Sequence, residues 1–156
     1  VMRKAQAKKL PLAPDPRFND KQVTRFVNTM MWAGKKTTAF NIFYTAIDKI
    51  SEMTSEDGYE IWKKAIQNVT PSVEVRSRRI GGATFQIPAE VRADRKISLS
   101  MKWLIRYSRD RNGKTMADKL AKELLAASKG EGAAFKKKED THRMADANKA
   151  FAHFRI

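Results

Sequence analysis

Residues 73–91 read VEVRSRRIGGATFQIPAEV, and this stretch separates two groups of predicted helices. Apolar residues alternate with polar ones on both sides of a central Gly-Gly pair. Alternation with a period of two predicts strands, and adjacent glycines supply the positive φ angles that a two-residue hairpin turn requires. We therefore predict a β-hairpin over about residues 73–91, with Arg78 opposite Phe85 and Arg76 opposite Ile87. Because an isolated two-stranded ribbon is marginally stable in water, its base should rest on the core and its tip should contact a partner.

Three helices are predicted between residue 19 and the hairpin. In each, apolar residues recur at intervals of three and four, which places them on one helix face. The pair Asn19 and Gln22 is typical of a helix start, as is Ser55, whereas Gly34 and Pro71 are typical of helix ends. The three apolar faces, which can bury a common core, are Val23, Phe26, Val27, Met30 and Met31; Ala39, Ile42, Phe43, Ala46, Ile47 and Ile50; and Ile61, Trp62, Ala65, Ile66 and Val69.

A fourth helix is predicted from Arg92 onward, with one apolar side and one cationic side. Ile97, Met101 and Leu104 should face the core. An acid-free stripe, spaced seven, four and three residues apart, should lie opposite them: Arg95, Lys102, Arg106 and Arg109. A helix of this kind is typical of contact with nucleic-acid phosphates, although a charged face is often simply solvated. If the stripe binds RNA, reversing Arg95, Lys102 and Arg106 to glutamate should abolish binding.

Two further helices are predicted near the C-terminus. One begins at Thr115, three residues before Asp118, and the segment Gly130-Glu131-Gly132 follows it as a break. The last helix, about residues 133–154, has a weak apolar face and should be half exposed and available to a partner. We therefore expect a mainly α fold: a single domain (residues 18–156) of about six helices with a protruding two-stranded β-hairpin, preceded by an extended basic N-terminal arm (residues 1–17).

The charge of the chain points to a polyanionic partner. The 156 residues contain 32 Lys and Arg against 17 Asp and Glu, a formal net charge of +15. Nucleic acid is the expected partner of such a surplus. The arm carries part of the surplus and contains three prolines that prevent a regular helix, although like-charged tails also serve only as solubilising segments. No apolar run is long enough to span a bilayer, no signal-peptide pattern is present and cysteine is absent, so we expect a cytoplasmic protein without a membrane partner.

Catalytic and metal-binding patterns are missing from the sequence. The only two histidines, His142 and His153, are predicted in one helix, about three turns apart, and so too distant to share a metal. The acids near the start of the third helix are explained by the helix dipole, and no phosphate-binding glycine loop occurs. We therefore predict no enzyme activity, cofactor, metal or small-molecule substrate. Among the aromatic residues, Trp103 lies beside the basic stripe and either packs or stacks on a nucleotide.

Several longer motifs carry a resemblance to a known family. They are FVN at residues 26–28, GKK at 34–36, PSVEVRSRRIGG at 71–82 and HRMADANKAFAH at 142–153. From about residue 15 to the C-terminus these motifs closely resemble, in order, the bacterial family of small-subunit (30S) ribosomal protein seven. The arm matches this family poorly.

The resemblance implies a helical bundle with a protruding hairpin, working in translation as part of the ribosome. It implies binding to the 3′ major domain of 16S ribosomal RNA early in assembly, and nucleation of the head of the small subunit. It places the hairpin and the last helix at the subunit interface, near the exit-site transfer RNA, the messenger RNA exit path and neighbouring head and platform proteins. The residues expected near transfer RNA and the platform are Ile80, Gly81, Gly82, Arg143 and Lys149. The resemblance and the charge pattern together give the expected ribosomal RNA contacts: Arg3, Lys4, Lys8, Lys9, Lys35, Lys36, Arg76, Arg78, Arg79, Arg92, Arg95, Lys96, Lys102, Arg106, Arg109, Arg111 and Lys114.

Two alternatives remain open from the residues alone. Short helices with a basic face also suit a DNA-binding regulator, although cations here spread over nearly every element outside the core. A basic RNA-modifying enzyme would carry similar charge, but the chain offers no acid-base or cofactor constellation.

Overall fold

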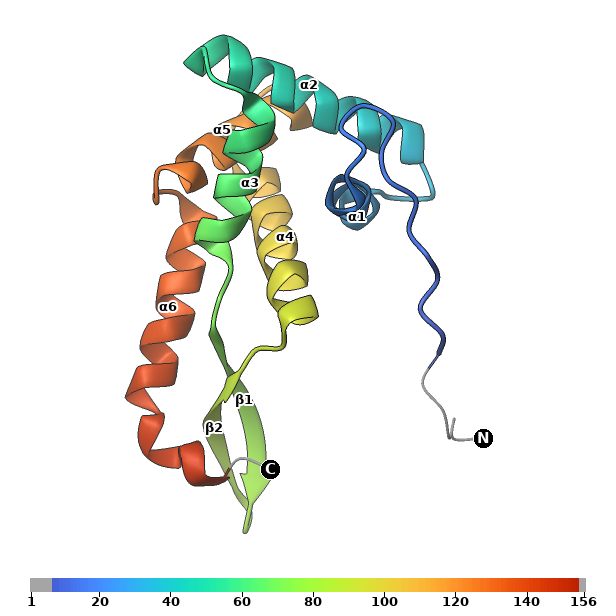
Figure 1. Ribbon diagram of the computed structural model, residues 1–156. Helices are drawn as coiled ribbons and strands as arrows, with labels where there is room; N and C mark the ends of the chain where they lie inside the picture. Colours follow the sequence, from blue (N-terminus) through green and yellow to red (C-terminus); the bar gives the residue numbers. More distant parts are fainter. Residues whose placement is uncertain (1–6, 155–156) are drawn as a thin grey trace.

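The helices on both sides of the hairpin pack into one bundle (Figure 1). The computed structural model describes residues 7–154, and within them the elements are α1 (Lys21–Met30), α2 (Lys36–Thr54), α3 (Gly58–Val69), β1 (Val73–Ile80), β2 (Ala83–Glu90), α4 (Ala93–Asp110), α5 (Met116–Ser128), α6 (Ala133–Ala147) and the 3-10 helix η1 (Lys149–Phe154). The hairpin and α6 extend side by side from the end of the bundle opposite α2. The predicted mainly α fold with a protruding hairpin is confirmed.

Aromatic side chains from three helices form the centre of the core. Trp62 is fully buried, and its ring lies 5.8 Å from that of Phe26 and 5.4 Å from that of Phe43, both in edge-on geometry. Such edge-to-face pairs add to the stabilisation that comes from burying apolar area. The core continues through Met101 and Leu104 of α4 and through the apolar face of α5. The predicted helix faces are therefore the ones that meet in the bundle.

Two predicted helix starts are wrong by one or two residues, and α1 ends at Met30, well before the predicted stop at Gly34. Asp20, not Asn19, caps α1: its carboxylate accepts a hydrogen bond from the backbone N–H of Gln22, while Asn19 has φ = 52°. Similarly, Asp57 caps α3, and Ser55, with φ = 57°, ends α2 instead of starting α3. In both places two residues with capping ability lie within two positions of each other, so composition alone does not choose between them. The predicted start of α5 at Thr115 is confirmed.

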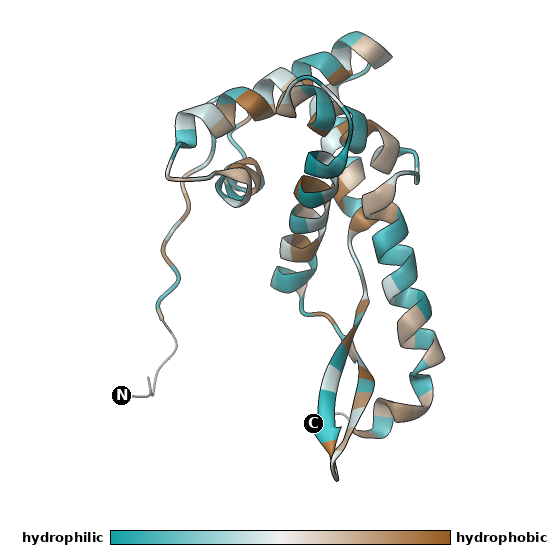
Figure 2. Cartoon of the chain, turned by 180° about the vertical axis from the view of Figure 1, so that it is seen from behind, coloured by the Kyte–Doolittle hydropathy of each residue, from teal (hydrophilic) through white to brown (hydrophobic). Residues whose placement is uncertain are grey.

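The final helix is two elements and not one. α6 ends at Ala147, where the side chain of Asn148 donates a hydrogen bond to the carbonyl of Met144, and η1 follows. An Asn side chain that bonds to a nearby backbone carbonyl competes with continued helix. The two histidines therefore lie on different elements. Hydrophilic residues dominate the middle of α6 (Figure 2), and its cation-rich side is half exposed as predicted.

The hairpin has the predicted register. Arg78 pairs with Phe85 and Arg76 with Ile87, and the turn residues Gly81 and Gly82 have φ values of 57° and 86°. Ile87 is buried about midway along the hairpin, where it pairs with Arg76. Nearer the tip, the ring of Phe85 lies 5.3 Å from Phe151 and 5.7 Å from Phe154 of η1. The ribbon is thus supported along its length by the C-terminal segment.

Asp15 fixes the chain just before α1. Its carboxylate accepts hydrogen bonds from the backbone N–H groups of Arg17, Phe18 and Asp20 and from the hydroxyl of Tyr44. Burial alone would raise the pKa of Asp15, but these hydrogen bonds outweigh it and lower the pKa below its ordinary value. Burial, together with the same contact, raises the pKa of Tyr44 to about 12. Residues 7–14, before this point, form neither helix nor strand.

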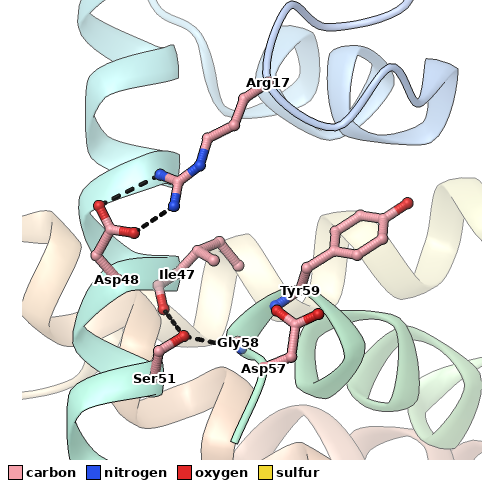
Figure 3. A network of polar contacts seen from close by, with 7 residues as sticks. All are labelled: Arg17, Ile47, Asp48, Ser51, Asp57, Gly58 and Tyr59. Carbon is pink, nitrogen blue, oxygen red and sulfur yellow. Dashed lines mark hydrogen bonds and ion pairs between the residues drawn. The ribbon is translucent and has the colours of Figure 1, made fainter.

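Gly58 lies at a close approach between α2 and α3 (Figure 3). The hydroxyl of Ser51 donates to the carbonyl of Ile47 at 3.2 Å and accepts from the N–H of Gly58 at 2.9 Å. A Cβ at position 58 would lie 2.3 Å from the carbonyl oxygen of Ile47, which is backbone and cannot rotate away. The glycine therefore sets the distance between the two helices.

Replacing Gly58 by alanine is expected to lower the free energy of unfolding by about 1–3 kcal/mol, because α3 must move away from α2. Urea unfolding followed by circular dichroism measures this change. Glu56→Ala, at an exposed position in the same connection, is the control and should change stability by less than about 0.5 kcal/mol. Equal stability of Gly58→Ala and the wild type would show that the approach is not tight.

Candidate nucleic-acid interface

The exposed side of α4 carries two cations that have no acidic partner. Lys102 and Arg106, one turn apart, are exposed, and no carboxylate among residues 7–154 lies within ion-pair distance of either. Met101 and Leu104 on the other side are fully buried. The rigid helix therefore presents two unneutralised charges at fixed spacing, which suits binding to consecutive phosphates.

The predicted acid-free stripe is wrong at Arg95, because an acid reaches it from β1. Glu74 is only 8% exposed, and its carboxylate accepts hydrogen bonds from Arg95 and Arg76. The ion-pair distances are 2.9 Å to Arg95 and 2.8 Å to Arg76. Burial would raise the pKa of Glu74, but the two guanidinium groups outweigh it and lower the pKa. Glu74 thus joins the base of the hairpin to α4 and fixes their relative orientation.

The stability of the protein is expected to fall at acid pH through Glu74. Because its pKa is lower in the folded than in the unfolded chain, the contribution of Glu74 is complete above its ordinary value of 4.5 and is lost as the pH falls through the lowered folded value. Urea unfolding of the wild type and Glu74→Gln between about pH 3 and 7 measures this. The variant should be less stable at pH 7, and the difference should shrink toward pH 3. A constant difference would contradict the role of the charge.

Arg109, at the end of the stripe, is half buried and is held by two contacts. Its guanidinium donates to the carbonyl oxygen of Met30 at 2.9 Å and lies 4.3 Å from the ring centre of Trp32. Burial lowers the pKa of Arg109, although a guanidinium stays protonated at neutral pH. Arg109 therefore joins the end of α1 to α4, and its charge is less available to a phosphate than that of Arg106.

The hairpin arginines differ in how they are held. Arg78 donates to the carbonyl of Phe154 at 2.9 Å, and Arg76 is bound to Glu74. Both line a pocket of about 340 Å³ that also contains Arg92, the exposed residue at the start of α4. Arg79 is exposed on β1. The structure therefore brings Arg76, Arg78 and Arg92 to one surface, whereas Arg79, next to Arg78 in the strand, points to the other face of the hairpin.

Two loops that are distant in sequence meet at a second pocket. Lys35, before α2, and Lys114, before α5, line the same hollow of about 420 Å³ together with Trp32. The neighbouring Lys36 is exposed, whereas Arg111 forms an ion pair with the buried Glu123. The sequence pattern did not single out Trp32, although a tryptophan between an apolar helix face and a glycine is a possible signal. Trp103, which was singled out, is half buried against the core.

The remaining predicted contact residues lie on the arm, on α4 and on the C-terminal segment. Lys8 is exposed, and Lys9 forms an exposed ion pair of 2.8 Å with Asp94 at the start of α4. Arg3 and Lys4 lie outside the described residues. Lys96 is partly exposed on α4, and Ile80, Gly81 and Gly82 form the hairpin tip. Arg143 on α6 and Lys149 at the start of η1 are exposed.

One group of acids lies at the end of the molecule farthest from the hairpin, where α2 meets α3 (Figure 1). They lie on the last turns of α2, in the connection that follows it and on the first turn of α3: Asp48, Glu52, Glu56, Asp57 and Glu60. The exposed cations of α4 and the hairpin lie away from this end. A polyanion is therefore attracted more strongly to the exposed cations of α4 and the hairpin than to this end.

The described residues offer no metal site. Within residues 7–154 no group of three or more His, Cys, Asp or Glu side chains could hold a metal ion. The ring of His142 instead accepts a hydrogen bond from the N–H of Ser72 at 3.1 Å. None of the described helices combines the length and the apolar character needed to cross a bilayer.

Comparison with known proteins gives a consistent result. The family model described as ribosomal protein S7p/S5e matches residues 2–149. The small ribosomal subunit protein uS7 of Cytophaga hutchinsonii is 64% identical over 155 residues, which cover 99% of this chain and 100% of that protein. The proteins of the same name from Christiangramia forsetii and Flavobacterium johnsoniae are each 66% identical over 158 residues, with the same coverage.

Proposed function

The chain belongs to the ribosomal protein S7p/S5e family, and from this premise we propose that it binds the 3′ major domain of 16S ribosomal RNA early in assembly and nucleates the head of the small subunit. Members of this family are structural ribosomal proteins and not enzymes. The protein is accordingly a constituent of the small ribosomal subunit, contacts ribosomal RNA there and resides in the ribosome in the cytoplasm.

The observation that carries the proposal is the fixed geometry of the cationic side. Lys102 and Arg106 lie on a rigid helix, and Glu74 holds the arginine-bearing hairpin at one angle to that helix. Contacts of lysine and arginine to phosphate position a protein without reading base sequence. Cationic groups at fixed relative positions can nevertheless select an RNA by its shape. A junction of RNA helices presents phosphates from several strands to such a surface.

The protein then acts as a clamp with several contact points. The exposed side of α4 and the base of the hairpin bind phosphates at the junction, and the basic arm passes between neighbouring RNA helices. Lys8 on the arm is exposed, and the ion pair of Lys9 with Asp94 holds the arm beside the start of α4. An RNA phosphate can replace Asp94 as the partner of Lys9 at little cost, because such exposed ion pairs contribute about 1 kcal/mol or less to stability.

A second face is proposed for the exit site. The hairpin tip and the C-terminal segment lie together at the end of the molecule remote from α2 (Figure 1). Gly81 and Gly82 expose bare backbone at this tip, while Arg143 of α6 and Lys149 of η1 are exposed cations of the C-terminal segment. We assign these residues, with Ile80, to the exit-site transfer RNA, the messenger RNA exit path and the neighbouring platform protein.

Hydroxyl-radical footprinting on full-length 16S ribosomal RNA tests the proposal. The expected result is protection confined to the 3′ major domain in the absence of other proteins. Protection restricted to another domain, or none at a protein concentration that saturates binding, would overturn it. Competition with duplex DNA of equal length separates recognition of folded RNA from simple attraction to phosphate. Duplex DNA carries phosphates but lacks the folded RNA junction, so it competes well only if phosphate attraction dominates.

A further inference from the structure

Trp32 is a large apolar side chain left in solvent at the edge of the cationic side. It lies just after α1 and is 70% exposed. The guanidinium of Arg109 lies 4.3 Å from the ring centre and is itself held by the carbonyl of Met30. One face of the indole is therefore supported by a fixed cation, and the exposed remainder of the ring is free to stack on another flat group.

The hollow beside Trp32 has apolar walls and a cationic rim. Its volume of about 420 Å³ falls within the range of small-ligand pockets, roughly 300–1,000 Å³. Met31, Ile42 and Met116 supply apolar surface, and Lys35 and Lys114 supply exposed cations at the rim. Lys119 also lines the hollow, but its amino group donates to the carbonyl oxygen of Arg109. No acidic side chain lines it among the described residues.

We propose that this pocket receives one unpaired base of ribosomal RNA, which stacks on the free face of Trp32 while Lys35 and Lys114 bind the flanking phosphates. The inference rests on the proposed function, because it concerns a nucleotide of the RNA that the α4 side binds. A base offers a flat aromatic face for the indole and the methionines, and its backbone offers anions for the rim. An apolar peptide would fill the walls but leave the lysines without partners.

Stacking of a base on Trp32 also gives a role to the contact between Arg109 and the indole ring. Stacking on an aromatic ring is stronger when the ring is already fixed, because less freedom is lost on binding. Arg109 immobilises the indole before RNA arrives and adds positive charge behind it. Arg109 is thus a positioning residue for Trp32, and Trp32 is the residue that touches the base.

The test compares Trp32→Ala and Trp32→Phe with Met53→Ala, a control that removes another exposed apolar side chain, 58% exposed and at the acidic end of α2. Binding of full-length protein to the 16S 3′ major domain is measured over a range of salt concentrations. Trp32→Ala should weaken binding about 5- to 150-fold, the range for loss of one stacked base, with no change in the salt slope. Trp32→Phe should retain most of the affinity, and Met53→Ala should bind as the wild type does.

A set of RNAs, each lacking one base, identifies the stacked nucleotide. At one position, removal of the base should weaken wild-type binding but cause no further loss in Trp32→Ala, because both changes delete the same contact. If Trp32→Ala binds as tightly as the wild type, or if no base shows this coupling, the pocket inference is overturned while the proposed function stands. If the wild type itself does not bind the 3′ major domain, the proposed function fails.

Discussion

Replacing Lys102 and Arg106 together by glutamate is expected to weaken binding to 16S ribosomal RNA by roughly 100- to 10,000-fold. Each charge-assisted hydrogen bond is worth about 1.5–3 kcal/mol, and about 1.4 kcal/mol corresponds to a factor of ten. Both side chains are exposed and lack acidic partners in the described part of the chain, so their reversal should leave the fold intact. Loss of two phosphate contacts should also reduce the salt slope of log affinity by about 1.4–1.8.

Filter binding or fluorescence anisotropy at several salt concentrations measures both quantities. The control reverses Lys64 and Lys122, which are exposed on α3 and α5 and outside the predicted interface, and it changes the net charge by the same amount. If the two double variants lose affinity equally, attraction depends on total charge and not on the side formed by α4. Arg95 is left out of the test because a glutamate there would face the buried Glu74 and destabilise the hairpin base.

Replacing Glu123 by alanine is expected to lower the free energy of unfolding by about 3–5 kcal/mol, the usual cost of breaking a buried ion pair. Glu123 of α5 is fully buried. It accepts a hydrogen bond from the N–H of Ala134 at 2.9 Å and binds the guanidinium of Arg111. One carboxylate thus ties the start of α6 and the α4–α5 connection to the core, and its removal leaves a buried N–H and a partly buried cation unpaired.

Thermal and urea unfolding measure this loss, and Glu123→Gln is the informative comparison. The amide oxygen can still accept from Ala134, so the glutamine variant should lose clearly less stability than the alanine variant. We also expect faster hydrogen exchange along α6 in Glu123→Ala, because the first turn of the helix then loses its hydrogen bond to the core and opens more often. Equal loss in the two variants would mean that the hydrogen bond to Ala134 contributes little.

Local patterns predicted the hairpin well because its determinants are adjacent in sequence. Alternation and the Gly-Gly pair fix the register whatever the rest of the chain does, and Arg78 lies opposite Phe85 as expected. The helix faces were predicted equally well, since a period of 3.6 is a property of each segment. The exact caps were not, because Asn19 and Asp20 have similar intrinsic preferences and their surroundings decide between them.

The candidate site depends on contacts between distant parts of the chain, and there the predictions were incomplete. Glu74 lies between Val73 and Val75 in the alternating pattern, but nothing local indicates that it reaches Arg95 on α4. The hollow at Trp32 exists only because the loops before α2 and α5 meet in the folded protein. Charge density identified the class of partner, whereas packing determines which cations are free to bind it.

Lysine acetylation followed by mass spectrometry tests the central claim most directly, by comparing the free protein with its complex on 16S ribosomal RNA. If the side formed by α4 and its adjoining loops binds RNA, Lys35 and Lys102 should react much more slowly in the complex. Lys64 and Lys122 should react at unchanged rates. Unchanged acetylation of Lys102 in a saturated complex, together with protection of Lys64, would contradict the account.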